Sequence, residues 1–273
     1  MDVFELRPLT VLERERLKGI AKSTYLTSLW GKALKPISHP LLLGHRGARP
    51  RLSRLGLRGP GAPSENSLAA FEYALAHGCD GFEFDVRFTS DRRSALCHDP
   101  KFGSREIAKT EYSALGRPRR FERRRTPVAC LEDVLARFGT TAYLDIEVKV
   151  AGQEEAIVSA IKTALPMRGF VVSSFLPEAL LRLHDLAPQL PLGYVCKHAD
   201  AAEQWQKLPI SVFIPQYRLV SQSLVDEIHA AGLKLFTWTV NHYRDLVRLA
   251  DCGVDGLISD YPTLLHRTFL RTQ

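Results

Sequence analysis

From residue 40 onward, short runs with the pattern of β-strands alternate with stretches that have the length and apolar spacing of helices. The strand runs cover residues 41–47, 81–89, 142–150, 170–175, 191–196, 212–217, 234–240 and 256–259. The helical patterns cover residues 67–77, 131–138, 153–165, 177–186, 199–207, 221–231 and 243–250, with a last one after Pro262. Such alternation predicts parallel strands joined by right-handed crossovers. Eight units within 273 residues favour a closed (β/α)8 TIM barrel, with an open doubly wound sheet as the alternative.

The chain is predicted to form one barrel domain over residues 39–273, preceded by an N-terminal helical extension over residues 1–38. Residues 10–35 mix apolar and basic side chains, which fits either a helix lying on an anionic membrane or a helix plugging the N-terminal end of the barrel. Residues 90–99 predict a turn and an extra extended segment, followed by a long basic loop. The acidic start does not resemble a signal peptide, and no apolar run is long enough to span a membrane, so a cytoplasmic protein is expected.

The positive charge of the chain is concentrated in two stretches. The whole sequence carries +7, which alone would suggest nucleic acid or an anionic membrane as a partner. Residues 46–64 contain five arginines and no acid, and residues 117–125 contain six arginines and one glutamate, so the rest of the chain is slightly acidic. Because both stretches follow predicted strand ends, we expect them to attract an anionic substrate, and nucleic acid is not expected. Five cysteines without a C-x-x-C pair are typical of reduced thiols rather than a zinc site.

Acidic residues alternate with apolar residues on two of the predicted strands. Glu83 and Asp85 share one face of their strand, and Asp145, Glu147 and Lys149 share one face of another. With the apolar residues directed at the helices, the charged residues face into the barrel, where unpaired carboxylates are costly. Oxygen ligands of this kind favour Mg²⁺ or Ca²⁺ over zinc. For Asp145 the alternative is a structural carboxylate paired with Lys149 or an arginine.

Two histidines stand at the ends of extended runs beside these strands. Because an imidazole ordinarily changes its charge near neutral pH, the two side chains, His45 and His98, can act as a general acid and base. Arg46 and Lys149 can bind a phosphate group, the arginine through its planar fork and the lysine as a point charge. Cys97 precedes His98 directly, but neighbouring strand residues point to opposite faces, so a thiol–imidazole pair is not favoured.

The ordered set of motifs resembles the glycerophosphodiester phosphodiesterases. The resemblance runs from about residue 41 to 263, and the matching pieces are His45-Arg46-Gly47, Glu65-Asn66, Glu83-x-Asp85-Val86 with Thr89 and Asp91, His98-Asp99, Glu147-x-Lys149, residues 237–241 and residues 253–262. It implies a TIM barrel in which His45 and His98 are the acid–base pair. It also implies a divalent cation bound by Glu65, Glu83, Asp85 and Glu147, and contacts of Arg46, Lys149, Asn66 and Trp238 with the substrate or its phosphate.

The reaction implied by this resemblance is hydrolysis of a small glycerophosphodiester to sn-glycerol 3-phosphate and an alcohol. Three departures bear on the substrate: the long spacing from His45 to Glu65, Ser64 where the family has proline, and a different continuation after Asp99. The alternatives are a lysophospholipase D or sphingomyelinase D-like activity at a membrane surface, and a catalytically silent anion-binding barrel.

Overall fold

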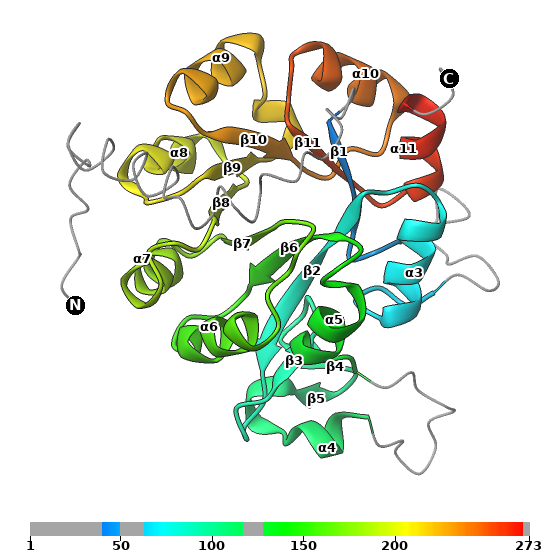
Figure 1. Cartoon of the computed structure of the whole chain (residues 1–273), viewed down its shortest axis with the longest axis vertical. Helices are drawn as coiled ribbons and strands as arrows, with labels where there is room; N and C mark the ends of the chain where they lie inside the picture. The colour runs from blue at the N-terminus through cyan, green and yellow to red at the C-terminus, as the bar shows by residue number, and fades with distance from the viewer. Residues whose placement is uncertain (1–39, 50–62, 117–127, 270–273) are drawn as a thin grey trace.

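In the computed structural model, which describes residues 40–49, 63–116 and 128–269, eight parallel strands close into a barrel (Figure 1). These are β1 Leu41–His45, β2 Gly81–Phe88, β6 Tyr143–Val148, β7 Phe170–Ser174, β8 Leu192–Cys196, β9 Val212–Pro215, β10 Lys234–Thr237 and β11 Gly256–Ser259. Closure occurs at β1, which pairs with β11 on one side and with β2 on the other. The predicted TIM barrel is therefore confirmed, because an open doubly wound sheet would end in two edge strands with one partner each, whereas here each of the eight strands pairs on both sides.

Helices surround the barrel. They are α3 Leu68–Ala76, α5 Leu131–Phe138, α6 Glu154–Thr163, α7 Pro177–Leu186, α8 Ala199–Ala202, α9 Gln222–Ala230, α10 Tyr243–Asp251 and α11 Pro262–Phe269. Local signals explain several boundaries: the Ser67 side chain caps α3, and Pro177 occupies the first turn of α7. The helix predicted over residues 199–207 is instead one α-helical turn followed by a 3-10 turn, Glu203–Lys207.

An accessory segment follows β2 outside the closed barrel. Strand β3 (Ser94–Leu96) pairs antiparallel with β2 and is the extra extended segment that the sequence predicts. The chain then forms a small hairpin of β4 (Lys101–Phe102) and β5 (Arg105–Glu106), a 3-10 turn and the short helix α4 (Tyr112–Leu115). A plain basic loop was expected here. Strands of two residues are too short to leave a periodic pattern, so the sequence does not reveal them.

Side-chain alternation divides the core into two layers. Residues such as Leu43, Val171 and Phe236 fill the barrel interior, whereas Phe82, Phe84 and Ile146 lie in the layer that packs against the helices. Toward the carboxyl ends of β1, β2 and β6, the inward face changes from apolar to charged. This polar end of the barrel, which we call the mouth, is where the candidate residues gather.

Several predictions concern residues outside the described ranges. These are the N-terminal extension over residues 1–38 and most of the two arginine-rich stretches, 50–62 and 117–127. Arg46 and Arg49 belong to the first stretch and are described. Among the helices of the described ranges, none is both long and apolar enough to cross a membrane.

Candidate active site

Three buried carboxylates form the centre of the mouth. Glu83 and Asp85 come from the inward face of β2, and Glu147 comes from β6, where it is the register partner of Asp85. One oxygen of each carboxylate lies within 4.8 Å of the others, a spacing that suits a shared cation. The alternation that the sequence predicts for these strands therefore brings the three acids to one point.

The pKa values and the hydrogen bonding of the carboxylates are those expected of a cation site. Burial, and then the charges of Asp85 and Glu147, raise the pKa of Glu83 well above its usual value. Burial followed by the charge of Asp85 raises the pKa of Glu147 to about 7. Glu83 Oε1 and Asp85 Oδ1 are buried without a hydrogen-bond partner among the described residues. Because a buried acceptor without a partner is costly, these oxygens fit a hard divalent cation.

Two basic side chains flank the carboxylates. Arg46 has a left-handed backbone (φ 53°), and this turn at the end of β1 directs its backbone N–H to Glu83 Oε2 at 2.9 Å. Its Nε lies 3.1 Å from Asp85 Oδ2. Lys149 Nζ lies 2.5 Å from Glu147 Oε1 and 3.3 Å from Asp85 Oδ1. Burial alone would raise the pKa of Asp85, but these cations and a hydrogen bond from Asn66 outweigh it and lower that pKa.

Glu65 and Asn66 contact this group from the start of the α3 segment. Glu65 accepts a hydrogen bond from Arg46 Nη1 at 3.2 Å and pairs with Arg49, so it lies outside the group of three carboxylates. The Asn66 side chain donates to Asp85 Oδ2 at 2.8 Å and accepts the Asp85 backbone N–H at 3.1 Å. Asn66 thus fixes the position of Asp85 from two sides.

His45 lies at the end of β1, and its ring is held by Asp260. Its Nδ1 lies 2.7 Å from Asp260 Oδ1, and its Nε2 lies 3.8 Å from Glu83 Oε2. Because a carboxylate only accepts, Nδ1 carries the proton and Nε2 is presented to the mouth. Asn241 donates to the other Asp260 oxygen at 2.7 Å and accepts the Asp260 backbone N–H at 2.9 Å. We call His45 and Asp260 the buried dyad.

His98 follows β3 and forms a more open pair. Its Nδ1 lies 2.8 Å from Asp99 Oδ1, with 38% of the His98 side chain and 74% of the Asp99 side chain exposed. Burial lowers the pKa of His98 below its usual value, and the hydrogen bond that His98 donates to Asp99 opposes that shift. We call His98 and Asp99 the rim dyad. Arg46, Asp85 and Lys149 lie close enough to act on His98 electrostatically, so both dyads border the same group of charges.

The side chains of Asp145 and Trp238 form their hydrogen bonds within the protein. Asp145 accepts a hydrogen bond of 2.5 Å from Ser173, and burial raises its pKa to about 7. The partner expected for it, Lys149 or an arginine, is therefore wrong, because the basic groups pair with carboxylates nearer the mouth. The Trp238 indole N–H donates to the backbone at 3.1 Å, and its ring packs edge-on against Phe175.

Sequence reasoning assigned no role to Asp260, Asn241 or Phe175. Asp260 and Asn241 are polar residues directly after predicted strands, but Asn241 contacts Asp260, and the pairing of Asp260 with His45 depends on the closure of β11 against β1. Phe175 left no signal in the sequence beyond following β7. Its ring lies 5.3 Å from Lys149 Nζ, so it forms part of the apolar wall beside the basic group.

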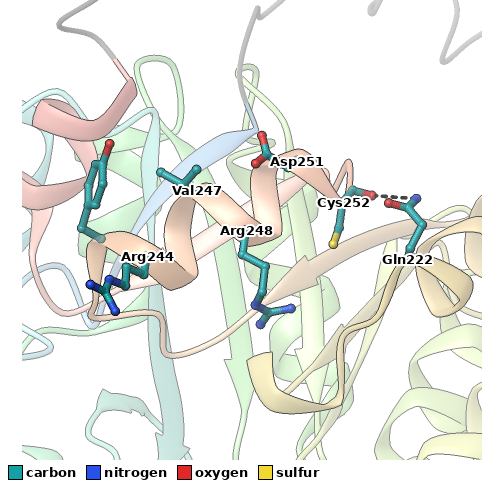
Figure 2. Close-up of a pocket in the computed structure, with 7 residues that line it drawn as sticks. Gln222, Arg244, Val247, Arg248, Asp251 and Cys252 are labelled. Atoms are coloured by element: carbon teal, nitrogen blue, oxygen red, sulfur yellow. Dashed lines mark hydrogen bonds between the residues drawn. The ribbon is translucent and has the colours of Figure 1, made fainter.

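A groove lies on the outer surface of the barrel. This groove of about 470 Å³ runs along α10 beside the start of α9 (Figure 2). It is lined by Gln222, Tyr243, Arg244, Val247, Arg248, Asp251 and Cys252. None of the predicted site residues lines it, so the chemistry concentrates at the mouth.

The chain resembles known proteins in both sequence and fold. The sequence model of the glycerophosphoryl diester phosphodiesterase family matches residues 45–264. A glycerophosphodiester phosphodiesterase of Caldanaerobacter subterraneus subsp. tengcongensis is 30% identical over 222 residues, which cover 74% of this chain and 90% of that protein. Human lysophospholipase D is 22% identical over 86% of this chain and 91% of its own length.

One solved structure of similar fold contains a bound ligand. The Oleispira antarctica phosphodiesterase in complex with its product sn-glycerol-3-phosphate matches this chain with a TM-score of 0.68 and 23% identity. The match covers 84% of this chain and 96% of that one.

Proposed function

This chain belongs to the glycerophosphoryl diester phosphodiesterase family and is a phosphoric diester hydrolase, and from that premise we propose the details of its reaction. The substrate is a small, water-soluble glycerophosphodiester, which is cleaved to sn-glycerol 3-phosphate and an alcohol. The observation that carries this proposal is the group of three buried carboxylates, two of them with an oxygen that accepts no hydrogen bond, bordered by two basic side chains and two histidines. The product bound to the Oleispira enzyme supports the same substrate class.

Glu83, Asp85 and Glu147 are proposed to bind a divalent cation, Mg²⁺ or Ca²⁺. A bound cation supplies Lewis-acid polarisation of a phosphoryl oxygen and offsets the charge of the acids. Glu65 remains a predicted further ligand, although its carboxylate contacts Arg46 and Arg49.

Arg46 and Lys149 are proposed to bind the phosphate. Both already face the carboxylates, so the phosphate would share them with Asp85 and Glu147. Asn66 contributes by holding Asp85, and Trp238 contributes its ring to the wall that it forms with Phe175.

His45 and His98 are proposed to move the protons. One accepts a proton from the attacking oxygen, and the other donates a proton to the oxygen of the leaving group. Asp260 keeps the proton of His45 on Nδ1, so Nε2 is the atom that exchanges protons with the substrate. The same pair serves attack by water and attack by a neighbouring substrate hydroxyl that gives a cyclic phosphate.

The test is a hydrolysis screen with the full chain. Glycerophosphocholine, glycerophosphoethanolamine and glycerophosphoglycerol are incubated with a chelator, and then with Mg²⁺ or Ca²⁺ restored separately. We expect release of glycerol 3-phosphate that the chelator abolishes and one cation restores. Activity that survives thorough chelation contradicts the cation proposal.

Lysophospholipase D activity is the second candidate, favoured by the similarity to human lysophospholipase D. Residues 10–35, with their basic amphipathic pattern, are proposed to contact anionic lipid in that case. Lysophosphatidylcholine in the same screen separates the candidates. Turnover of the lipid without turnover of glycerophosphocholine would replace the first candidate by the second.

A further inference from the structure

We propose that Arg87 is a positioning residue that holds the backbone of His98 in place. The sequence motifs assign no role to Arg87, and it lies outside the carboxylate group. The inference rests on the proposed role of His98 in proton transfer.

The contact itself is a fork on one carbonyl oxygen. Arg87 Nε donates to the backbone oxygen of His98 at 2.9 Å, and Arg87 Nη2 donates to the same oxygen at 2.7 Å. Hydrogen bonds from a charged donor are stronger than neutral ones, and the planar guanidinium makes the pair directional. Two bonds from one rigid group restrict the carbonyl more than a single bond does.

Arg87 connects the His98 backbone to a strand of the barrel. It belongs to β2, two residues beyond Asp85, and its register partner on β3 is Ala95. Strand β2 is paired on both sides, with β1 and β6 in the barrel, so its backbone is fixed. The strand that supplies two of the carboxylates therefore also sets the position of His98.

The His98 segment needs such a support. The sheet contact of this segment ends with the bond from the Cys97 N–H to the Asp85 oxygen at 3.0 Å, after which the chain bends away from the sheet. The side-chain partner of His98 is Asp99, which is 74% exposed and therefore gives little restraint. Arg87 ties the His98 backbone to the barrel at the point where the sheet no longer does.

The first experiment compares Arg87→Ala and Arg87→Lys with a matched control, Arg93→Ala. Arg93 directly precedes β3, and its guanidinium stacks on the Tyr112 ring at 4.4 Å. We expect Arg87→Ala to lower kcat about 10- to 100-fold, because small displacements of an acid–base group are costly. KM and the Kd for Mg²⁺ or Ca²⁺ should stay within about 2-fold, and Arg87→Lys should fall in between, because an ammonium keeps the charge but not the fork. Arg93→Ala should keep wild-type kcat.

The second experiment asks whether Arg87 acts through His98. In a double-mutant cycle, the loss caused by Arg87→Ala should largely disappear in the His98→Ala background. Amide hydrogen exchange, which needs no activity, should become faster over residues 97–99 in Arg87→Ala and stay unchanged in the other strands of the barrel.

Three results would overturn the inference. An increase in KM at unchanged kcat would make Arg87 a substrate ligand. An equal loss in the His98→Ala background would make its effect independent of His98. Unchanged exchange over residues 97–99 would remove the positioning role itself. Full activity of His98→Ala would instead contradict the proposed function, while the exchange result would still decide the role of Arg87.

Discussion

The two dyads at the mouth place the same chemical pair, a histidine and an aspartate, in opposite surroundings. In the buried dyad, the side chains of His45 and Asp260 are each 11% exposed, and Asn241 contacts Asp260 through two hydrogen bonds. In the rim dyad, Asp99 is 74% exposed and adjoins His98 in the sequence. The buried dyad joins β1 to the residue after β11, whereas the rim dyad lies on the accessory segment outside the closed barrel.

The difference shows how one fold fixes two proton-transfer groups by different means. Barrel closure brings Asp260 next to His45 across 215 positions of sequence, so the carboxylate itself determines the orientation of the ring. The rim dyad gains little from its exposed carboxylate, and its order comes from the backbone, through β3 and the fork of Arg87. Aspartates with the same partner are therefore expected to differ in their contribution to catalysis.

The largest effects are expected from the histidines. His45→Ala and His98→Ala should each lower kcat about 10²- to 10⁴-fold, the usual contribution of a general acid or base. Release of glycerol 3-phosphate under saturating substrate measures this. His229→Ala is the control, because His229 forms an exposed pair with Asp255 near the start of β11, at the other end of the barrel. Unchanged activity of His45→Ala would remove the catalytic assignment of the buried dyad.

Asp260→Asn should have the next largest effect. The new amide can donate a hydrogen bond to His45 Nδ1 when that nitrogen carries no proton, so it favours the tautomer with the proton on Nε2. We therefore expect kcat to fall about 10- to 100-fold, as for other residues that orient a functional histidine. KM and thermal stability should change little, because the amide has the shape of the carboxylate.

Asp255→Asn is the matched control for this variant. Asp255 also accepts from a histidine, and its loss should affect stability rather than kcat. If Asp260→Asn keeps the kcat of the wild type, the buried dyad is structural.

The cation should affect both dyads, since Glu83 borders His45 and the charge of His98 acts on Asp85. Without a cation, folded Glu147 titrates at about 7 and Glu83 well above its usual range, so the folded state binds more protons than the unfolded chain from about pH 4.5 upward. The stability of the cation-free protein should therefore rise as the pH falls through 7. A bound cation needs the carboxylates unprotonated, so its stabilisation is largest above pH 7.

Thermal unfolding with and without cation measures this linkage. At about 100 times Kd we expect Tm to increase by about 5–10 °C at pH 8 and by less at pH 6. Glu83→Gln should lose the increase, and Glu155→Gln, which alters an exposed ion pair with Arg182, should keep it. An equal or larger increase at pH 6 would contradict the carboxylate assignment.

The parts of the site that were predictable from the sequence are those set by local periodicity. Alternation along single strands was sufficient to assign Glu83, Asp85 and Glu147 to the inward face, because the side-chain period of a strand is fixed. The partners of Asp145 and His45 were not predictable, since Ser173 and Asp260 reach them across neighbouring strands of the closed barrel. Long-range pairing of this kind depends on register and closure, which a single sequence does not specify.

The smallest effect should come from Asp99→Asn. The hydrogen bond with His98 lowers the pKa of Asp99, but the carboxylate is mostly in solvent, where such a pair contributes about 1 kcal/mol or less. We therefore expect kcat to fall by about 5-fold at most. Measuring Asp99→Asn beside Asp260→Asn with the same substrate gives the contrast between the dyads directly. Equal losses in the two variants would mean that burial does not distinguish the aspartates. His98 would then not need support through its backbone.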